Sequence, residues 1–340
     1  MSLSSPRAVR LAGLLAAAAA GCGPPAGPSW TTPVTGLDRA VLSAWGAGPR
    51  DVWFAGGGLG SGPGALVLHF DGDAFVEETP MALSATLWWV FGLSSDDLYF
   101  CGEGGNILHR TGGAFAPMKS GTSYTLYGLW GTSDSNLWAV GGAPGQAGVL
   151  LHFDGNAWAP AAGAPASTKS YFKVWGSAAD DVWVVGQGGT ILHFDGQAWT
   201  SMTSGVMDVM NTTLLTVTGR ARDDVWAVGG FGQGVALHWD GTSWSHVAQL
   251  EVDTIEGLAG ISEDAAGDVV TDGLGGAKLR RSGGTWSDDT AVPPTNDFHG
   301  AWLDGPEDAF AVGGNYIPPA PAARRGVIAH YGATLPSVIR

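Results

Sequence analysis

The sequence predicts an all-β protein that folds as a seven-bladed β-propeller of four-stranded antiparallel blades. The first observation is a repeat of 39 to 46 residues, which is the length of one propeller blade. The second observation is that β-branched and aromatic residues form short runs between Gly and Asp clusters, and no run is long enough for an amphipathic helix. One aromatic or apolar residue closes the phrase Asp-Val-Trp, or a variant of it, in each repeat: Trp53, Tyr99, Trp138, Trp183, Trp226, Val270 and Phe310.

The fourth repeat shows the four expected strands, which we name a to d in chain order: 171–175, 181–186, 190–194 and 197–202. Between strands c and d stands Asp195-Gly196, a typical two-residue hairpin turn. Such a turn predicts that His193 pairs with Ala198 and that Leu192 pairs with Trp199. The expected blades span 40–82, 83–121, 122–165, 166–208, 209–252, 253–295 and 296–331.

The ring needs one further strand d, because the last repeat lacks the Trp or Phe that the other d strands contain. The stretch 29–32 resembles a strand d that has no blade of its own, so we expect it to complete the last blade through Trp30. The alternative closure uses the tail after His330, with Leu335 in place of the Trp.

Composition favours one compact domain and excludes one class of partner. The chain has 55 Gly and 16 Trp residues, a combination that suits many turns around a packed core. Its formal net charge of −15 repels phosphates, so we expect no nucleic-acid partner. All-β folds often run long as one domain, and we expect residues 29–340 to form one monomeric propeller.

The N-terminus has the three parts of an export signal. Arg7 and Arg10 precede an apolar stretch over 11–20, and small residues lead to Cys22. We expect a signal peptide over 1–21 and a Pro/Gly-rich tether over 22–28. The sequence around Cys22 resembles the bacterial lipobox, which implies lipidation of Cys22 and anchoring at the periplasmic or outer face of the cell envelope; the alternative is an ordinary secretory signal.

Two propeller families share phrases with this chain. The stretches 225–230 and 237–241, followed by Trp244, resemble kelch repeats in their Gly-Gly doublet and in the aromatic residue near a turn. The Asp-Gly turn followed by Trp is also similar to Asp-box (BNR) repeats. These resemblances imply an architecture, and they imply no particular activity.

No group of residues predicts catalysis, a metal site or a cofactor. Six His residues share one position of the repeat, which indicates a structural role: His69, His109, His152, His193, His238 and His330. Acidic pairs such as Asp180-Asp181 fall in the turn between strands a and b, where Asp caps its own backbone, and we favour this role over a calcium-binding rim. Cys101 occupies a position of small apolar residues, so we expect it to be buried. In the sixth repeat we expect Asp272 and Arg280 to compensate each other's buried charge.

The loops that join strand b to strand c, and strand d to the next strand a, vary in length and share one face of the disc, which we call the long-loop face. Fixed scaffolds with variable loops favour recognition, so we expect a non-catalytic scaffold that binds a protein or a glycan there. The candidate ligand-binding residues are Trp88, Tyr124, Tyr171, His299, Tyr316, Arg324 and Arg325. The alternatives are a glycoside hydrolase or lyase of the sialidase-like type, which needs two carboxylates in an axial pocket, and a structural component of an envelope assembly, which needs an exposed apolar patch.

Overall fold

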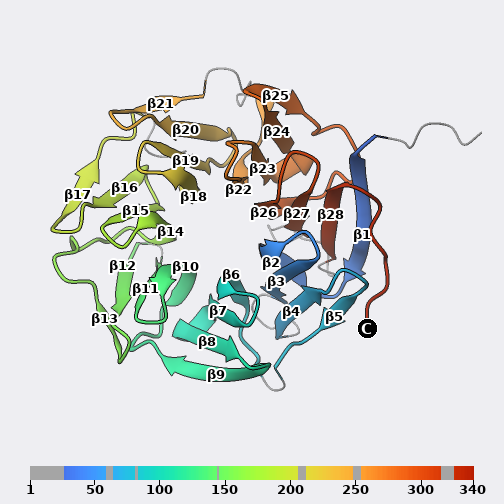
Figure 1. Cartoon of the computed structure of the whole chain (residues 1–340). Coiled ribbons are helices and arrows are strands. Elements are labelled where there is room, and N and C mark those ends of the chain that lie inside the picture. Colours follow the sequence, from blue (N-terminus) through green and yellow to red (C-terminus); the bar gives the residue numbers. More distant parts are fainter. Residues whose placement is uncertain are drawn as a thin grey trace, which may run out of the picture.

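The computed structural model describes residues 27–58, 64–80, 83–143, 145–205, 212–247, 254–314 and 325–340. They form seven four-stranded antiparallel sheets arranged as blades around a central axis, and this confirms the predicted fold class (Figure 1). In each blade the first strand lies nearest the axis and the fourth lies at the rim (Figure 1). Within these residues, no helix has the length and hydropathy needed to cross a bilayer.

The strands follow the expected repeats. Blades one to four contain β2 (Ala40–Gly48), β3 (Asp51–Gly57), β4 (Ala65–Phe70), β5 (Phe75–Glu77); β6 (Leu87–Ser94), β7 (Asp97–Gly102), β8 (Asn106–Thr111), β9 (Ala114–Lys119); β10 (Thr125–Ser133), β11 (Asn136–Ala143), β12 (Ala147–Phe153), β13 (Trp158–Pro160); and β14 (Tyr171–Ala178), β15 (Asp181–Gly186), β16 (Thr190–Phe194), β17 (Trp199–Met202). Blades five to seven contain β18 (Leu214–Ala221), β19 (Asp224–Gly229), β20 (Val235–Trp239), β21 (Trp244–His246); β22 (Leu258–Glu263), β23 (Val269–Gly273), β24 (Lys278–Ser282), β25 (Thr285–Asp288); and β26 (Phe298–Leu303), β27 (Ala309–Gly313), β28 (Gly326–Gly332) with β1 (Ser29–Leu37). Short 3-10 turns, η1 (Glu103–Gly105) and η3 (Leu274–Gly276), join the second and third strands of blades two and six.

The predicted hairpin register between strands c and d is wrong. In blade four Phe194 pairs with Trp199, and His193 pairs with Thr200. The reason is that Asp195 is the first residue of the turn and not its centre: its amide donates to the Ala198 carbonyl, 3.3 Å away. The Asp195 carboxylate then accepts two backbone N–H groups of the same turn, and Gly196 supplies the required positive φ of 89°.

The ring closes through the N-terminal strand, as expected. β1 pairs antiparallel with β28, and Trp30 lies opposite Tyr331. The Trp30 indole also donates to the Asp289 carboxylate at the edge of blade six, 2.8 Å away. The C-terminal tail adds a second connection, because Ile339 forms a parallel bridge with Phe75 on the rim of blade one. Both ends of the chain therefore hold blade seven to its neighbours.

The shared His position is structural, which confirms the prediction. In blade four the His193 ring stacks on Trp183 with centroids 4.0 Å apart, and its Nε2 lies 2.7 Å from Asp181 at the start of β15. The other five repeat this bond with Asp or Asn at the same position: His69–Asp51, His109–Asp97, His152–Asn136, His238–Asp224 and His330–Asp308. Each imidazole thus ties two strands of one blade together, and none of these bonds joins one blade to another.

Neighbouring blades contact each other through a Trp and a Gly near the end of the innermost strand. A Cβ built on Gly92 would lie 2.4 Å from the Trp45 ring of the preceding blade, so only Gly leaves room for the indole. The pattern is broken after blade five, where Thr218 replaces the Trp and Glu263 the next Gly, and after blade six, where Ser262 and Leu303 occupy these positions. At these two contacts a small side chain in one blade is matched by a larger side chain in the next blade.

The predicted compensation between Asp272 and Arg280 is wrong. Arg280 lies opposite Val270, and its Nε pairs with Asp289, 2.7 Å away. Asp272 is fully buried, lies opposite Lys278, and accepts the Gly260 N–H at 3.0 Å. The strand register separates the two charges, so each finds its own partner.

Cys101 is fully buried as expected, and burial raises the pKa of its thiol to about 12.

Candidate binding site

The innermost strand of every blade contains a β-bulge at the same position. The pairing of each such strand with its neighbour skips one residue: Leu42, Trp88, Tyr127, Phe172, Leu215, Ala259 and His299. A bulge bends the strand and changes the direction of the extra side chain. Six of these seven residues, all except Leu42, line one cavity.

This cavity, which we call the axial cavity, lies at the start of the innermost strands and therefore on the long-loop face. Its volume is about 250 Å³. Lys173 and Thr216 also line it, and Phe231 reaches it from the loop that follows β19. Phe231 is 46% exposed, so it places an apolar surface at the mouth of the cavity.

Aromatic rings form a continuous wall on one side of the axial cavity. The Trp88 ring lies 5.5 Å from the His299 ring and 5.2 Å from the Tyr127 ring, between centroids. The Tyr127 ring in turn lies 5.2 Å from Phe172. These distances are typical of favourable aromatic pairs, so four blades contribute to one packed surface.

Lys173 brings a positive charge to the axial cavity. Its side chain is buried, its Nζ donates to the Tyr127 carbonyl at 2.8 Å, and the same atom lies 4.4 Å from the centre of the Trp89 ring. Burial lowers the pKa of Lys173 to about 7, because desolvation penalises the ammonium form. Within the described residues, no carboxylate forms an ion pair with Lys173.

His299 is neutral at physiological pH. Its Nδ1 donates to the Leu42 carbonyl, 2.7 Å away. Burial, together with the nearby charge of Lys173, lowers the pKa of His299 to about 3. The imidazole therefore contributes a polar but uncharged surface to the cavity.

The structure brings two of the seven predicted site residues together, Trp88 and His299. Tyr124 and Tyr171 line a separate hollow of about 330 Å³, where Tyr171 is 2% exposed and belongs to the core between blades three and four. Arg325 is exposed and does not line the axial cavity. Tyr316, Arg324 and the lipidation candidate Cys22 lie outside the described residues.

Sequence reasoning missed Tyr127, Phe172, Leu215 and Lys173. The first three occupy the same repeat position as Trp88 and His299, so alignment of the innermost strands would have found them. Lys173 was detectable as a charged residue within a strand that is otherwise apolar.

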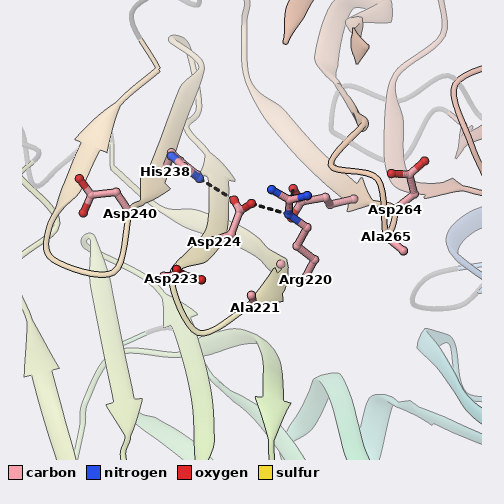
Figure 2. A pocket seen from close by; sticks show the side chains of 10 residues that line it. Arg220, Ala221, Asp223, Asp224, His238, Asp240, Asp264 and Ala265 are labelled. Atoms are coloured by element: carbon pink, nitrogen blue, oxygen red, sulfur yellow. Dashed lines mark hydrogen bonds and ion pairs between the residues drawn. The ribbon is translucent and has the colours of Figure 1, made fainter. Parts of the chain in front are cut away.

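A second hollow, of about 790 Å³, lies on the opposite face between blades five and six (Figure 2). Asp224 lies between His238 and Arg220 and accepts from both, at 2.7 Å and 2.5 Å (Figure 2). Asp240 accepts two backbone N–H groups of its own turn, which is the turn chemistry expected for this face. In the part of the chain that the structure describes, no three His, Cys, Asp or Glu residues are placed to share a metal ion.

No protein-family model matches the chain, and no curated protein matches it. Solved structures with the same fold do match. A YCF48 structure bound to D1 peptide is 14% identical, with a TM-score of 0.63, over 91% of this chain and 98% of that one. The WD40 propeller domain of Doa1 is 11% identical, with a TM-score of 0.63, over 92% of this chain and 99% of that one.

The GH74 xyloglucanase from Xanthomonas campestris is 13% identical, with a TM-score of 0.62, over 88% of this chain and 55% of that chain. At such low identity these similarities establish the β-propeller fold and leave the activity open.

Proposed function

We propose that this protein is a non-catalytic binding protein that recognises a segment of a protein partner through the axial cavity. The observation that supports this most is the set of bulges, which turns side chains from six blades into one apolar concave surface on the long-loop face. Concave apolar surfaces with few polar groups are typical of binding sites. The solved propeller bound to D1 peptide supports a peptide as the kind of ligand.

The described lining of the axial cavity argues against the glycosidase alternative. A glycoside hydrolase needs two carboxyl groups on either side of the scissile bond. The described residues that line the axial cavity contribute no Asp or Glu side chain. Glycan binding without hydrolysis stays as the second candidate, because aromatic rings such as Trp88 can also stack on sugars.

A displayed library of random peptides tests the proposal. We expect the protein to enrich peptides that contain an aromatic or long apolar residue. Ala259→Trp should abolish this enrichment, because Ala259 lines the cavity and the indole would fill it. Ala116→Trp is the matched control, since Ala116 is exposed on the outermost strand of blade two.

Two results would contradict the proposal. One is the absence of any enrichment by the unmodified protein, and the other is equal enrichment by Ala259→Trp, with folding of both variants checked by circular dichroism. A glycan array that is positive for the unmodified protein and negative for Ala259→Trp would favour the glycan candidate instead.

We further propose that the propeller is exported and anchored to the bacterial envelope through Cys22, and that its repeat is related to the kelch and Asp-box repeats. The charged and apolar leader and the lipobox-like sequence before Cys22 support the anchor. Labelling of the full chain with radioactive palmitate should be lost in Cys22→Ser. Equal labelling of both chains would refute the anchor and leave the binding proposal unaffected.

The exposed large apolar residues within the described ranges are Phe231, Val292, Val338 and Ile339. They come from the mouth of the axial cavity, from the segment after β25 and from the C-terminal tail. Three separate segments give less support to the third candidate, a structural component of an envelope assembly, than one apolar patch would.

A further inference from the structure

Lys173 is particular to its blade and is not imposed by the repeat. The equivalent position, one residue after each bulge, holds a residue without charge in the other six blades: Ser43, Trp89, Thr216 and three Gly residues, Gly128, Gly260 and Gly300. The fold therefore forms without a cation at this position. The charge needs another explanation, and ligand binding provides one.

The groups that face Lys173 do not neutralise it. Tyr127 on β10 offers a backbone carbonyl, and Trp89 on β6 offers the face of its ring. Cys101 on β7 remains a neutral thiol, and His299 on β26 remains a neutral imidazole. A carbonyl and an aromatic face offset part of the desolvation of an ammonium group, but a buried cation is best stabilised by a full negative charge.

The surroundings of Lys173 limit what can supply this charge. Lys173 is one of the residues that line a cavity of about 250 Å³ whose other walls are largely aromatic and aliphatic. A ligand that enters must replace water with apolar contacts along Trp88, Phe172 and Leu215 and must also present an anionic group to Lys173. The indole N–H of Trp88 is buried without a hydrogen-bond partner among the described residues, so it is a second potential donor in this wall.

We propose that the axial cavity binds a carboxylate joined to an aromatic or aliphatic body, with Lys173 as the partner of the carboxylate. This inference rests on the proposed function and specifies the chemistry of the ligand. A free organic acid, the C-terminus of a peptide and an acidic side chain beside an apolar residue all supply this chemistry.

The test compares a matched acid and amide, 3-phenylpropionate and 3-phenylpropionamide, by isothermal titration calorimetry at pH 6. We expect the acid to bind at least about tenfold more tightly than the amide, because a charge-assisted contact with Lys173 is available only to the acid. Lys173→Met should remove this preference, so that the acid binds no more tightly than the amide. The control is Lys169→Met, which removes an exposed lysine of the same blade and should keep the preference.

The preference for the acid should also decline between pH 6 and pH 9, since Lys173 loses its proton in this range while the carboxylate stays ionised. A second comparison identifies the source of the carboxylate: N-acetyl-Gly-Gly-Phe as the acid and as the amide, and N-acetyl-Phe-Glu amide. Tighter binding of the first acid indicates a chain end, and tighter binding of the Glu peptide indicates an acidic side chain.

Equal affinities of acid and amide for the unmodified protein would overturn the inference and leave the proposed function standing. An acid preference that survives in Lys173→Met would also overturn it. If no probe binds and no displayed peptide is enriched, the proposed function fails together with the inference.

Discussion

Replacing the buried lysine of the axial cavity tests whether its charge destabilises the protein. The pKa of Lys173 is about 7 in the folded chain, against an ordinary value of 10.5. Below pH 7 the lysine is protonated in both the folded and the unfolded state, so the cost of burying the charge is constant. Between pH 7 and pH 10.5 the unfolded chain binds more protons than the folded chain, so the free energy of unfolding rises with pH in this range.

The magnitude follows from the size of the pKa shift. One pKa unit corresponds to about 1.4 kcal/mol. The free energy of unfolding should therefore rise by roughly 5 kcal/mol between pH 7 and pH 10.5 through the titration of Lys173 alone. We expect the free energy of unfolding of the unmodified protein to rise by roughly 1.4 kcal/mol per pH unit relative to Lys173→Met above pH 7. Met has a similar length and no charge, so the substitution removes the titration and keeps most of the packing.

Urea unfolding followed by Trp fluorescence, at half-unit steps from pH 6 to pH 10, measures the difference between the two proteins. Taking the difference cancels the other groups that titrate in this range. Lys169→Met is the control, because an exposed lysine should leave the pH profile unchanged. Parallel profiles for the unmodified protein and Lys173→Met would refute the argument that Lys173 is a desolvated cation.

Three further predictions concern packing and burial. Gly92→Ala should lower the free energy of unfolding by about 1–3 kcal/mol, because its Cβ would overlap the Trp45 ring. Gly48→Ala is the control and should be nearly neutral, because nothing lies within 4 Å of a Cβ at that position. Chemical denaturation of both variants measures the difference, and equal effects would contradict the prediction. Trp30→Ala should lower the free energy of unfolding by about 3–5 kcal/mol, because it removes a buried indole and its hydrogen bond to Asp289 where the propeller closes. The midpoint of thermal unfolding measures the effect, and an unchanged midpoint would mean that the C-terminal tail alone is enough to close the propeller. Burial raises the pKa of Asp272 well above its ordinary value, so the folded chain binds more protons than the unfolded chain above pH 4. The unmodified protein should therefore lose stability relative to Asp272→Asn as the pH rises from 4 to 7. Identical pH profiles of the two proteins would show that Lys278 and the Gly260 N–H compensate the charge fully.

The repeat alone predicted the architecture, because each blade needs the same local features. In blade four the bounds of strands b and c were predicted to the residue, since β-branched and aromatic runs between Gly and Asp clusters depend only on neighbours in the chain. The structural role of the His position followed from its recurrence, as the six equivalent bonds confirm. The closure through Trp30 was also predictable, because a strand d without a blade has only one unfilled place in a closed ring.

The hairpin register and the partner of Asp272 depended on atoms that sequence patterns do not specify. The Asp195 carboxylate selects a turn that starts one residue later than the Asp-Gly pair suggests. The 3-10 turn before β24 places Lys278, and not Arg280, opposite Asp272.

The axial cavity is the feature that the sequence alone could not predict. Repeat length and strand composition are local, so the sequence by itself determined seven blades, their inner strands and the face with variable loops. The axial cavity is made by residues from different blades that lie about 40 residues or more apart in the chain, and they meet only when the ring closes. Only the tertiary structure could show that the bulges bring Trp88 and His299 into one wall, and that Lys173 is buried there without a carboxylate, because burial and distance depend on the arrangement of all the blades at once.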